Sequence, residues 1–421
     1  MNKIDVVLGL QWGDEGKGKM VDVLTPGYKI VARFQGGPNA GHSLVFGGDS
    51  FVLHTVPSGI FREDTANVIG NGVVIDPTVL MEEIRAIGAK GVDVPARLLV
   101  SKRAHLILPT HRMLDAASES ALGKGKIGST LRGIGPAYAD KTGRYGLRAG
   151  DILLPDFRAR YDALKQRHLR LLASYPQTGF DLESAEKAWF EAVEAMKELQ
   201  FIDSEWYINR ALDEGTPILA EGAQGSLLDI DFGAYPFVTS SNTMAAGVCT
   251  GLGVAPSRIG RVWGIFKAYC TRVGSGPFPT ELFDADGERL RQVGHEFGAT
   301  TGRPRRTGWF DLPALKYSVM MNGVTDLIMM KPDVMDDFDT VKAAVAYKVG
   351  DQVVDTLPYD AEGVVPVYRE FPGWKTDLSG IRSYDALPAA FRDYVRFIET
   401  GTGCPVTIIS VSPDRDAVIL R

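Results

Sequence analysis

Ile4-Asp5-Val6-Val7-Leu8-Gly9-Leu10, followed by Gly13-Asp14-Glu15-Gly16-Lys17-Gly18-Lys19, is the stretch of sequence that decides the fold. An apolar strand that ends in a loop rich in glycine and lysine is typical of phosphate-binding proteins. The glycines let backbone N–H groups approach the oxygens, and lysine neutralises their charge. The loop differs from a regular P-loop, since neither Lys17 nor Lys19 precedes the Ser or Thr that would bind Mg²⁺. A carboxylate among such amides repels phosphate unless it holds a metal or removes a proton, so Asp14 is the first catalytic candidate.

Short apolar runs separated by glycine-rich turns continue along the chain. They are 29–34, 51–56, 67–70, 97–100 and 105–108, then 217–220, 262–269, 326–330, 341–349 and 406–411. With a helix expected over 77–87, they predict an α/β fold whose large central sheet is mostly parallel and surrounded by helices, similar to P-loop NTPases.

Two segments have a different character. Residues 118–148 are rich in glycine and charge with little apolar periodicity, which predicts an irregular stretch that is functional or disordered. Residues 151–214 contain one glycine, Gly179, and repeat apolar residues at helical spacing, which predicts a helical subdomain. Because sheet-like runs lie on both sides of it, we expect one domain over residues 1–421, with the helical subdomain at about 151–214 inserted in it.

Composition sets limits on partners and location. Of 421 residues, 45% are hydrophobic and 23% charged, and the net charge of −6 gives no reason to expect a nucleic acid or an anionic membrane as partner. The scattered Cys249, Cys270 and Cys404 fit a reducing cytosol better than a disulfide framework or a zinc site. No apolar stretch approaches the roughly 20 residues that span a bilayer, so we expect a cytoplasmic protein.

A second glycine-rich turn, Gln35-Gly36-Gly37-Pro38-Asn39-Ala40-Gly41-His42-Ser43, follows the apolar run that ends at Phe34. Neighbouring strands of a parallel sheet end at the same edge, so this turn can face the Asp14 loop. His42 would then lie near Asp14 and act as an acid or base. The alternative is a hydrogen-bonded structural histidine.

Three arginines and three hydroxyl side chains gather in Ala299-Thr300-Thr301-Gly302-Arg303-Pro304-Arg305-Arg306-Thr307-Gly308. Guanidinium groups suit bidentate recognition of carboxylate or phosphate. We therefore expect a loop that binds an anionic ligand rather than a solvated face. Residues 127–138, with Thr130 and Arg132, predict a weaker second anion site, and Arg144 belongs to the same segment.

Met330-Lys331-Pro332-Asp333 ends another apolar run. Many GTP-binding proteins recognise guanine with Lys-x-Asp after a strand, because the carboxylate accepts hydrogen bonds from the ring N–H and the exocyclic amine while the lysine stem packs on the base. The tripeptide is common by chance and gains weight from the phosphate loop in the same chain. The backbone of Ser410-Val411-Ser412 could supply the other wall of the base pocket.

Two more polar turns follow apolar runs, Glu221-Gly222-Ala223-Gln224-Gly225-Ser226 and Val238-Thr239-Ser240-Ser241-Asn242-Thr243. Gln224 offers a donor and an acceptor, so it could recognise a neutral base edge or orient a reacting group. Each of these segments alone could be a structural turn. Because several such turns occur in one chain, we favour a ligand-binding site.

Taken together, these motifs resemble the adenylosuccinate synthetase family. The similarity runs in order over nearly the whole chain, through residues 11–19, 39–42, 132–138, 221–225, 238–243, 271–281, 299–303 and 413–415. It implies GTP-dependent ligation of L-aspartate to IMP, giving adenylosuccinate, GDP and phosphate through a 6-phosphoryl-IMP intermediate, as the committed step from IMP to AMP. GTP is the implied co-substrate, and one Mg²⁺ per subunit is the implied cofactor.

The resemblance also implies catalytic roles. Asp14 would take a proton from the purine ring nitrogen, and His42 would act as general acid toward the transferring phosphoryl group. Lys17 would neutralise phosphate charge, and Gln224 completes the catalytic set. Mg²⁺ would be bound by Asp14 and the carbonyl of Gly41.

The remaining contacts are carried over position by position. The residues implied for IMP are Asp14, Glu15, Gly16, Lys17, Asn39, Ala40, Gly41, His42, Thr130, Arg144, Gln224, Thr239 and Arg303. Those for GTP are Gly13, Asp14, Glu15, Gly16, Lys17, Gly18, Lys19, Gly41, His42, Ser43, Arg305, Lys331, Pro332, Asp333, Ser410, Val411 and Ser412. Those for aspartate are Ala299, Thr300, Thr301, Gly302, Arg303, Pro304 and Arg305. Arg144 would reach the IMP of the other subunit, which implies a homodimer.

The chain departs from the bacterial family pattern at Pro38, Leu131 and Ser412, where a His and two Gly are usual. Leu131 adds a side chain to a loop expected to bind the IMP phosphate, and Ser412 adds a Cβ to the guanine wall. These departures concern affinity and loop order rather than the reaction.

Two alternatives remain. A phage-type relative couples aspartate to dGMP and gives 2-aminoadenylosuccinate. There the position of Asp14 typically carries a smaller residue that makes room for the guanine amino group, whereas this chain retains the aspartate. A non-catalytic GTP-binding switch would need the Ser or Thr after the loop lysine, which this chain lacks.

Overall fold

The computed structural model describes residues 2–46, 49–175, 179–298 and 302–421. Its strands are β1 (Ile4–Gly9), β2 (Ile30–Arg33), β3 (His42–Phe46), β4 (Asp49–Leu53), β5 (Ala66–Ile69), β6 (Val74–Ile75), β7 (Leu98–Ser101), β8 (His105–Leu106), β9 (Gln200–Ile202), β10 (Ile218–Glu221), β11 (Ile259–Lys267), β12 (Cys270–Arg272), β13 (Arg306–Gly308), β14 (Phe310–Asp311), β15 (Asp326–Met330), β16 (Thr340–Val349), β17 (Gln352–Val354), β18 (Val365–Pro372), β19 (Val406–Ser410) and β20 (Val418–Leu420). Its α-helices are α1 (Lys17–Leu24), α2 (Pro77–Gly88), α3 (Val94–Arg97), α4 (Pro109–Ala121), α5 (Ile134–Gly143), α6 (Phe157–Leu172), α7 (Leu182–Met196), α8 (Ser204–Asp213), α9 (Gly247–Leu252), α10 (Ala285–Val293), α11 (Leu312–Asn322) and α12 (Ala389–Thr402).

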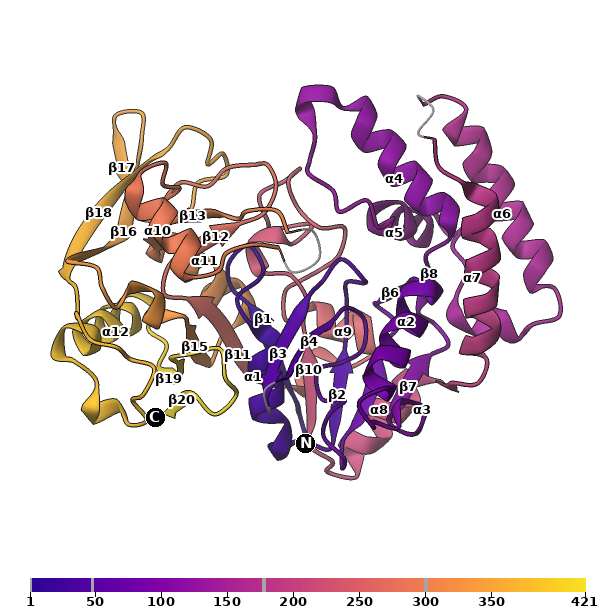
Figure 1. Ribbon diagram of the computed structural model, residues 1–421, viewed down its shortest axis with the longest axis horizontal. Helices are drawn as coiled ribbons and strands as arrows, with labels where there is room; N and C mark the ends of the chain where they lie inside the picture. The colour runs from indigo at the N-terminus through magenta and orange to yellow at the C-terminus, as the bar shows by residue number, and fades with distance from the viewer. Residues whose placement is uncertain (1, 47–48, 176–178, 299–301) are drawn as a thin grey trace.

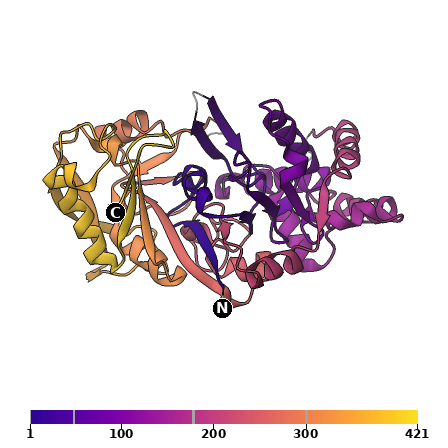
Figure 2. The same ribbon diagram turned by 90° about the horizontal axis from the view of Figure 1, so that it is seen from below.

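Ten strands form one sheet in the order β20-β19-β15-β11-β1-β10-β2-β5-β7-β9. Neighbouring strands are parallel, apart from the edge pair β19–β20. The predicted α/β fold with a large, mostly parallel sheet is therefore confirmed. In Figures 1 and 2, α12 lies at one end of the molecule and α6 and α7 at the other, with the sheet between them.

The central strands are apolar on both faces. Val6 and Leu8 of β1 belong to one hydrophobic cluster, and Val7, between them, belongs to another. Successive side chains of a strand point to opposite faces, so both faces of β1 are covered. A parallel sheet covered on both sides is built from continuous apolar runs, which explains why the sequence located these strands well.

One expectation about strand order is wrong. The strands before the Asp14 loop and the His42 turn were expected to be neighbours, but β10 lies between β1 and β2, with Ala220 opposite both Val6 and Ala32. The turn still faces the loop, since a Cβ on Gly18 would lie 2.9 Å from the Cβ of His42. The partners of β1 on both sides, β10 and β11, follow it in the chain by about 200 residues or more. Apolar runs show that strands exist, whereas their order depends on which faces the connecting helices cover.

The expectation of an irregular stretch over 118–148 is only partly correct. Helix α4 continues to Ala121, and α5 occupies 134–143. The buried face of α5 consists of Ile134, Ala137, Tyr138 and Asp140. Such a short face, with a buried carboxylate in it, produces little apolar periodicity in the sequence.

The helical segment shares its core with the first part of the chain. Trp189 and Val193 of α7 belong to the same hydrophobic cluster as Leu80 and Ile84 of α2. On this basis we propose that the chain is one domain with a helical subdomain at about 151–214. Among the described residues, no helix is long and apolar enough to cross a membrane.

Candidate active site

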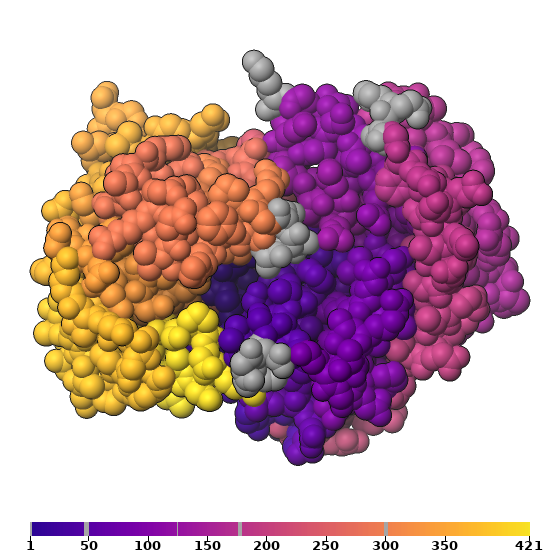
Figure 3. All heavy atoms as spheres, viewed as in Figure 1, coloured from indigo at the N-terminus to yellow at the C-terminus, as the bar shows by residue number. Residues whose placement is uncertain are grey.

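Polar residues lie at the carboxyl ends of six consecutive strands of the sheet. In sheet order they are 410–412 at the end of β19, 331–333 after β15, Lys267 at the end of β11, the loop after β1, Glu221–Gln224 at the end of β10 and the turn after β2. The carboxyl edge of an open parallel sheet is the usual place for ligands. Figure 3 shows a hollow between the orange and the purple parts of the molecule, with indigo N-terminal atoms at its floor.

The loop after β1 presents backbone N–H groups at the start of α1. Gly16, at the N-cap, has φ 95°, a conformation that favours glycine, and its helix end has no side-chain cap. Asp14 also adopts a left-handed conformation, with φ 59°. Uncapped N–H groups at a helix N-terminus form an anion site, so the loop can bind phosphate.

The side chain of Glu15 stabilises this loop through hydrogen bonds. Its buried carboxylate accepts hydrogen bonds from the backbone N–H groups of Gln11 (3.1 Å) and Gly13 (2.9 Å) and pairs with the Lys17 ammonium at 2.5 Å. A Cβ on Gly225 would lie 2.4 Å from Glu15 Oε1, so the turn after β10 packs tightly on this carboxylate. The implied contact of Glu15 with nucleotides would therefore use its backbone.

Asp14 contacts an arginine from the other half of the chain. Arg305 Nε donates to Asp14 Oδ2 at 2.7 Å, and the carboxylate keeps 34% of its surface exposed. Burial by itself would raise the pKa of Asp14, but the positive charges of Arg305, Lys267 and Lys17 outweigh it and leave the pKa below its usual value. Asp14 is thus an ionised carboxylate at neutral pH, available to a proton or a cation.

His42, the first residue of β3, is paired with Glu221, the last residue of β10. The Nδ1 of His42 lies 2.5 Å from Glu221 Oε1, so this nitrogen carries the proton and donates it. Ser58 donates to the same carboxylate through its backbone N–H, to Oε2 at 2.8 Å, and through its hydroxyl, to Oε1 at 2.7 Å. Nε2 of His42 is buried without a hydrogen-bond partner among the described residues. The pair therefore presents one imidazole lone pair to the site.

The charge state of this pair follows from its burial. Burial and the nearby charge of Arg33 lower the pKa of His42, although Glu221 opposes them. Burial would raise the pKa of Glu221, but the hydrogen bond from His42 and the charge of Arg33 hold it low. A neutral imidazole is thus oriented by an ionised carboxylate. Sequence reasoning did not single out Glu221; the signal was a charged residue directly after a buried apolar run.

Gln224 and Asn39 are brought together across β10 and β2. Gln224 Nε2 donates to Asn39 Oδ1 at 3.2 Å, and Gln35 Nε2 lies 3.4 Å from Gln224 Oε1. Gln224 has a positive φ of 57°. Two residues implied for IMP, distant in sequence, therefore form one polar surface beside the His42 turn.

The predicted guanine site lies at the ends of β15 and β19. Asp333 lies in a short 3₁₀ turn (Pro332–Met335), and its Oδ1 is buried without a partner among the described residues. Burial raises the pKa of Asp333, while the charges of Lys331 and Lys19 oppose the rise. An open buried acceptor needs a donor from a ligand.

Lys19 contacts the opposite wall of this pocket. Its ammonium donates to Ser410 Oγ (2.7 Å) and to the carbonyls of Ser412 (2.7 Å) and Ala417 (3.2 Å). Burial lowers the pKa of Lys19 to about 8. The lysine fixes the backbone expected beside guanine, whereas the neighbouring Lys17 stays within the phosphate loop.

Other predicted residues lie apart from these contacts. Thr130 and Arg144 are exposed, Arg144 as the residue that ends α5, and Thr239 is half-buried and donates its backbone N–H to Leu228. Arg303 is exposed, and its carbonyl accepts a hydrogen bond from the Gly298 N–H. Ala299, Thr300 and Thr301 lie outside the described residues.

A cluster of His111, Asp140 and His168 has the composition of a metal site, but it does not fit one. His111 Nδ1 accepts a hydrogen bond from the Leu108 N–H at 2.9 Å, so its Nε2 carries the proton that it donates to Asp140 at 3.0 Å. Binding a metal through Nε2 would place a proton on Nδ1, facing another N–H. This cluster is a hydrogen-bonded support for α5. The oxygen donors of Asp14 and Gly41 suit Mg²⁺ better.

Comparison with known proteins gives consistent matches. The family model described as "Adenylosuccinate synthetase" matches residues 6–419. The adenylosuccinate synthetase of Bacteroides thetaiotaomicron is 60% identical over 420 residues, covering 100% of this chain and 99% of that protein. The enzyme of Christiangramia forsetii is 59% identical over 421 residues, covering 99% and 100%.

Two solved structures are similar in fold. The fully ligated adenylosuccinate synthetase of Plasmodium falciparum superposes with a TM-score of 0.94 at 37% identity, covering all of both chains. The succinoaminodeoxyadenylate synthetase of cyanophage S-2L, bound to dGMP and dATP, gives a TM-score of 0.65 at 22% identity, covering 100% of this chain and 95% of that one. The second likeness extends to the fold alone.

Proposed function

The chain belongs to the adenylosuccinate synthetase family and ligates L-aspartate to IMP with GTP as co-substrate in AMP synthesis, and we propose that Asp14 and His42 carry its chemistry. The observation on which the proposal rests is the ionised Asp14 carboxylate inside a phosphate-binding loop. The lactam oxygen of IMP is a poor leaving group and has to be phosphorylated before an amine can displace it.

In the first step Asp14 takes the proton from the ring nitrogen, which makes the purine oxygen a nucleophile. That oxygen forms a bond to the γ-phosphorus of GTP as the bond to GDP breaks. In the second step the aspartate amine attacks the purine carbon that carries the phosphorylated oxygen. Inorganic phosphate leaves from that carbon, and the amine loses a proton. The uncapped N–H groups of the loop and Lys17 stabilise the transferring phosphoryl charge.

His42 supplies the second reacting group. Its Nδ1–H is held by Glu221, and its open Nε2 is the atom that meets the phosphoryl oxygens. Nearby phosphate charge raises the pKa of an imidazole, so ligand binding favours the protonated form that a general acid requires. Glu221 is a positioning residue, because it fixes the tautomer and direction of His42 without meeting the substrate.

The proposed nucleotide sites lie along the carboxyl edge of the sheet. We propose that guanine is recognised by Asp333 with Lys331 and the backbone of 410–412, and that Arg305 contacts GTP. IMP would contact the Asp14 loop, the turn over Asn39–His42 and Gln224, together with Thr130, Thr239 and Arg303. The loop over 299–305 would bind the carboxylates of aspartate. The exposed position of Arg144 supports a contact with a second subunit, and hence a homodimer.

Mg²⁺ would be held by the Asp14 carboxylate and the Gly41 carbonyl. A magnesium ion at this place supplies positive charge to the GTP phosphates. We propose a cytoplasmic location, in accord with the free Cys249, Cys270 and Cys404.

Incubation of the purified protein with IMP, GTP, Mg²⁺ and L-aspartate tests the proposal. The ultraviolet absorbance of the purine should shift only when all four are present, and EDTA should abolish the shift. Loss of GTP without an aspartate-dependent shift in absorbance would indicate the alternative of a GTP-binding switch that makes no purine product. Reaction with dGMP in preference to IMP would indicate the phage-type activity, which the retained Asp14 disfavours.

A further inference from the structure

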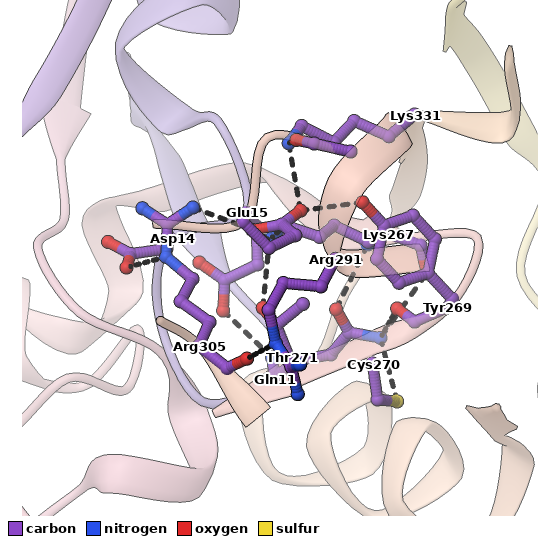
Figure 4. Close-up of polar contacts among 12 residues, drawn as sticks. Gln11, Asp14, Glu15, Lys267, Tyr269, Cys270, Thr271, Arg291, Arg305 and Lys331 are labelled. Carbon is purple, nitrogen blue, oxygen red and sulfur yellow. Dashed lines mark hydrogen bonds and ion pairs between the residues drawn. The ribbon is translucent and has the colours of Figure 1, made fainter. Parts of the chain in front are cut away.

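A fully buried carboxylate, Glu296, lies at the centre of a charged cluster that neither the sequence motifs nor the reaction assigns. Its Oε1 accepts hydrogen bonds from Lys331 Nζ (2.8 Å), Tyr269 OH (2.6 Å) and Lys267 Nζ (2.9 Å). Its Oε2 accepts from Arg305 Nη1 (2.6 Å) and again from Lys267 Nζ (3.0 Å). Figure 4 shows Arg305 beside Asp14 on one side of this cluster, with Lys267, Tyr269 and Lys331 on the other.

The partners of Glu296 divide into two kinds. Lys267 is fully buried, and it also donates to the Thr271 hydroxyl at 2.8 Å, so it neutralises the carboxylate inside the core. One such cation satisfies the requirement that a buried charge be paired. Arg305 and Lys331 keep 11% and 32% of their side-chain surface exposed. Arg305 also reaches Asp14, and Lys331 belongs to the predicted guanine site.

Arg305 lies between two carboxylates. Its Nη1 donates to Glu296 while its Nε donates to Asp14. When Asp14 turns to the purine and the metal, Nε loses its partner, yet Nη1 still fixes the direction of the guanidinium. The freed Nε–H is then available to an anionic oxygen of a ligand.

Lys331 is held in a similar way at the guanine site. Its ammonium donates to Glu296 Oε1 and to the Gly294 carbonyl at 2.6 Å, and its backbone adopts a positive φ of 57°. The lysine stem is thereby fixed in one direction, two residues before Asp333 in the chain. Its direction depends on the anion at its tip.

We propose that Glu296 is a positioning residue shared by two parts of the active site, which fixes Lys331 for guanine and Arg305 for the phosphoryl and aspartate side. This inference rests on the proposed roles of Lys331 and Arg305. Its consequence is that one buried charge affects both GTP affinity and turnover. IMP binding, whose implied contacts exclude both cations, does not depend on it.

The test is Glu296→Gln, which keeps the size of the side chain and removes its charge. The dissociation constant for GTP should rise about 10-fold or more and kcat should fall by a similar factor, each corresponding to about one charge-assisted hydrogen bond. The dissociation constant for IMP should stay within about 2-fold, a change near the scale of thermal energy. A merely structural role would weaken IMP and GTP binding together and overturn the inference.

Glu281→Gln is the matched control. Glu281 pairs with Arg306, the residue after Arg305, through Nε at 2.7 Å and through Nη2. It has no contact with Asp14, Lys331 or Glu296 within the part of the chain that the structure describes. This variant should lower thermal stability without changing the ratio of GTP affinity to IMP affinity.

A double-mutant cycle with Arg305→Met separates the two routes. If Glu296 acts on turnover through Arg305, the double variant should have the kcat of Arg305→Met alone, within about 2-fold. Independent multiplication of the two kcat losses would overturn the inference. If Glu296→Gln does not fold, Glu296→Asp keeps the charge but is too short to reach both cations, and the same loss of GTP affinity is expected. An inactive wild-type protein would contradict the proposed function, whereas an active one with an unchanged Glu296 variant would contradict only this inference.

Discussion

Two carboxylate contacts of the candidate active site, Glu221–His42 and Asp14–Arg305, differ in burial and in the number of hydrogen bonds that the carboxylate accepts. Glu221 and His42 are 0% and 5% exposed, and both oxygens of Glu221 accept from fixed donors, three hydrogen bonds in all. Asp14 is 34% exposed and holds Arg305 through a single oxygen. A complete buried pair orients a reacting group before the substrate arrives. An exposed single contact is free to exchange its partner, so we propose that the difference separates the residue that positions from the residue that reacts.

Asp14→Asn is expected to have the largest effect, because it removes the group that reacts. The kcat should fall by about 10³-fold, within the range for loss of a general base, while nucleotide binding stays largely intact. The measurement is steady-state turnover together with binding of IMP and GTP. Near-normal turnover would mean that the exposed contact is only structural.

Glu221→Gln removes the charge of the complete pair. The amide has only one acceptor oxygen, so if that oxygen accepts from the Ser58 backbone N–H, as Oε2 does now, the NH₂ group faces His42 and the tautomer of His42 is no longer fixed. We expect kcat to fall about 10²-fold, less than the loss of a triad carboxylate, with KM for GTP little changed. Ser58→Ala, which keeps the backbone donor, should cost much less. Equal effects of Glu221→Gln and Ser58→Ala on kcat would contradict the positioning role.

Asp333→Asn tests a carboxylate that lacks a partner for one oxygen. The KM for GTP should rise about 10- to 100-fold, the factor for one hydrogen bond to a charged group, and KM for IMP should stay near its wild-type value. Titration of each nucleotide separately measures the two constants. Equal weakening of both would place the guanine site elsewhere.

Leu131→Gly should have the smallest effect. Leu131 adopts a positive φ of 57° and is exposed, a conformation that costs a leucine about 1–2 kcal/mol but is open to glycine. Because glycine also gains unfolded-state entropy, the free energy of unfolding should rise by no more than about 1 kcal/mol. Urea denaturation measures it. Marked destabilisation would show that the leucine side chain makes a needed contact.

The motif residues of the site were predictable because their chemistry is local. The Asp14 loop, the His42 turn and Lys331–Asp333 each follow an apolar run, and a strand followed by a polar turn is visible in one stretch of sequence. Their general roles were inferred from the residue types, their specific roles came from the family resemblance, and both stay predictions. What they contact was not predictable, since Glu221 lies 179 residues from His42 and Arg305 lies 291 residues from Asp14.

Two further buried charged residues, Lys267 and Glu296, differ in how far the sequence could have indicated them. Lys267 ends an apolar strand, and a lysine in such a run has to be paired when buried, so a signal was present although it did not identify the partner. Glu296 follows a helix in a polar segment and gave no signal. Its importance comes from three cations that converge on it from separate segments.

The sequence by itself determined that this is a parallel α/β protein with a phosphate loop that carries a carboxylate, because apolar runs and glycine turns act over a few residues. Only the tertiary structure decided that β10 separates β1 from β2, that Glu221 orients His42, and that three cations from separate segments meet at Glu296. Strand order and buried ion pairs depend on packing between distant segments, and the energy of a buried charge depends on every group around it.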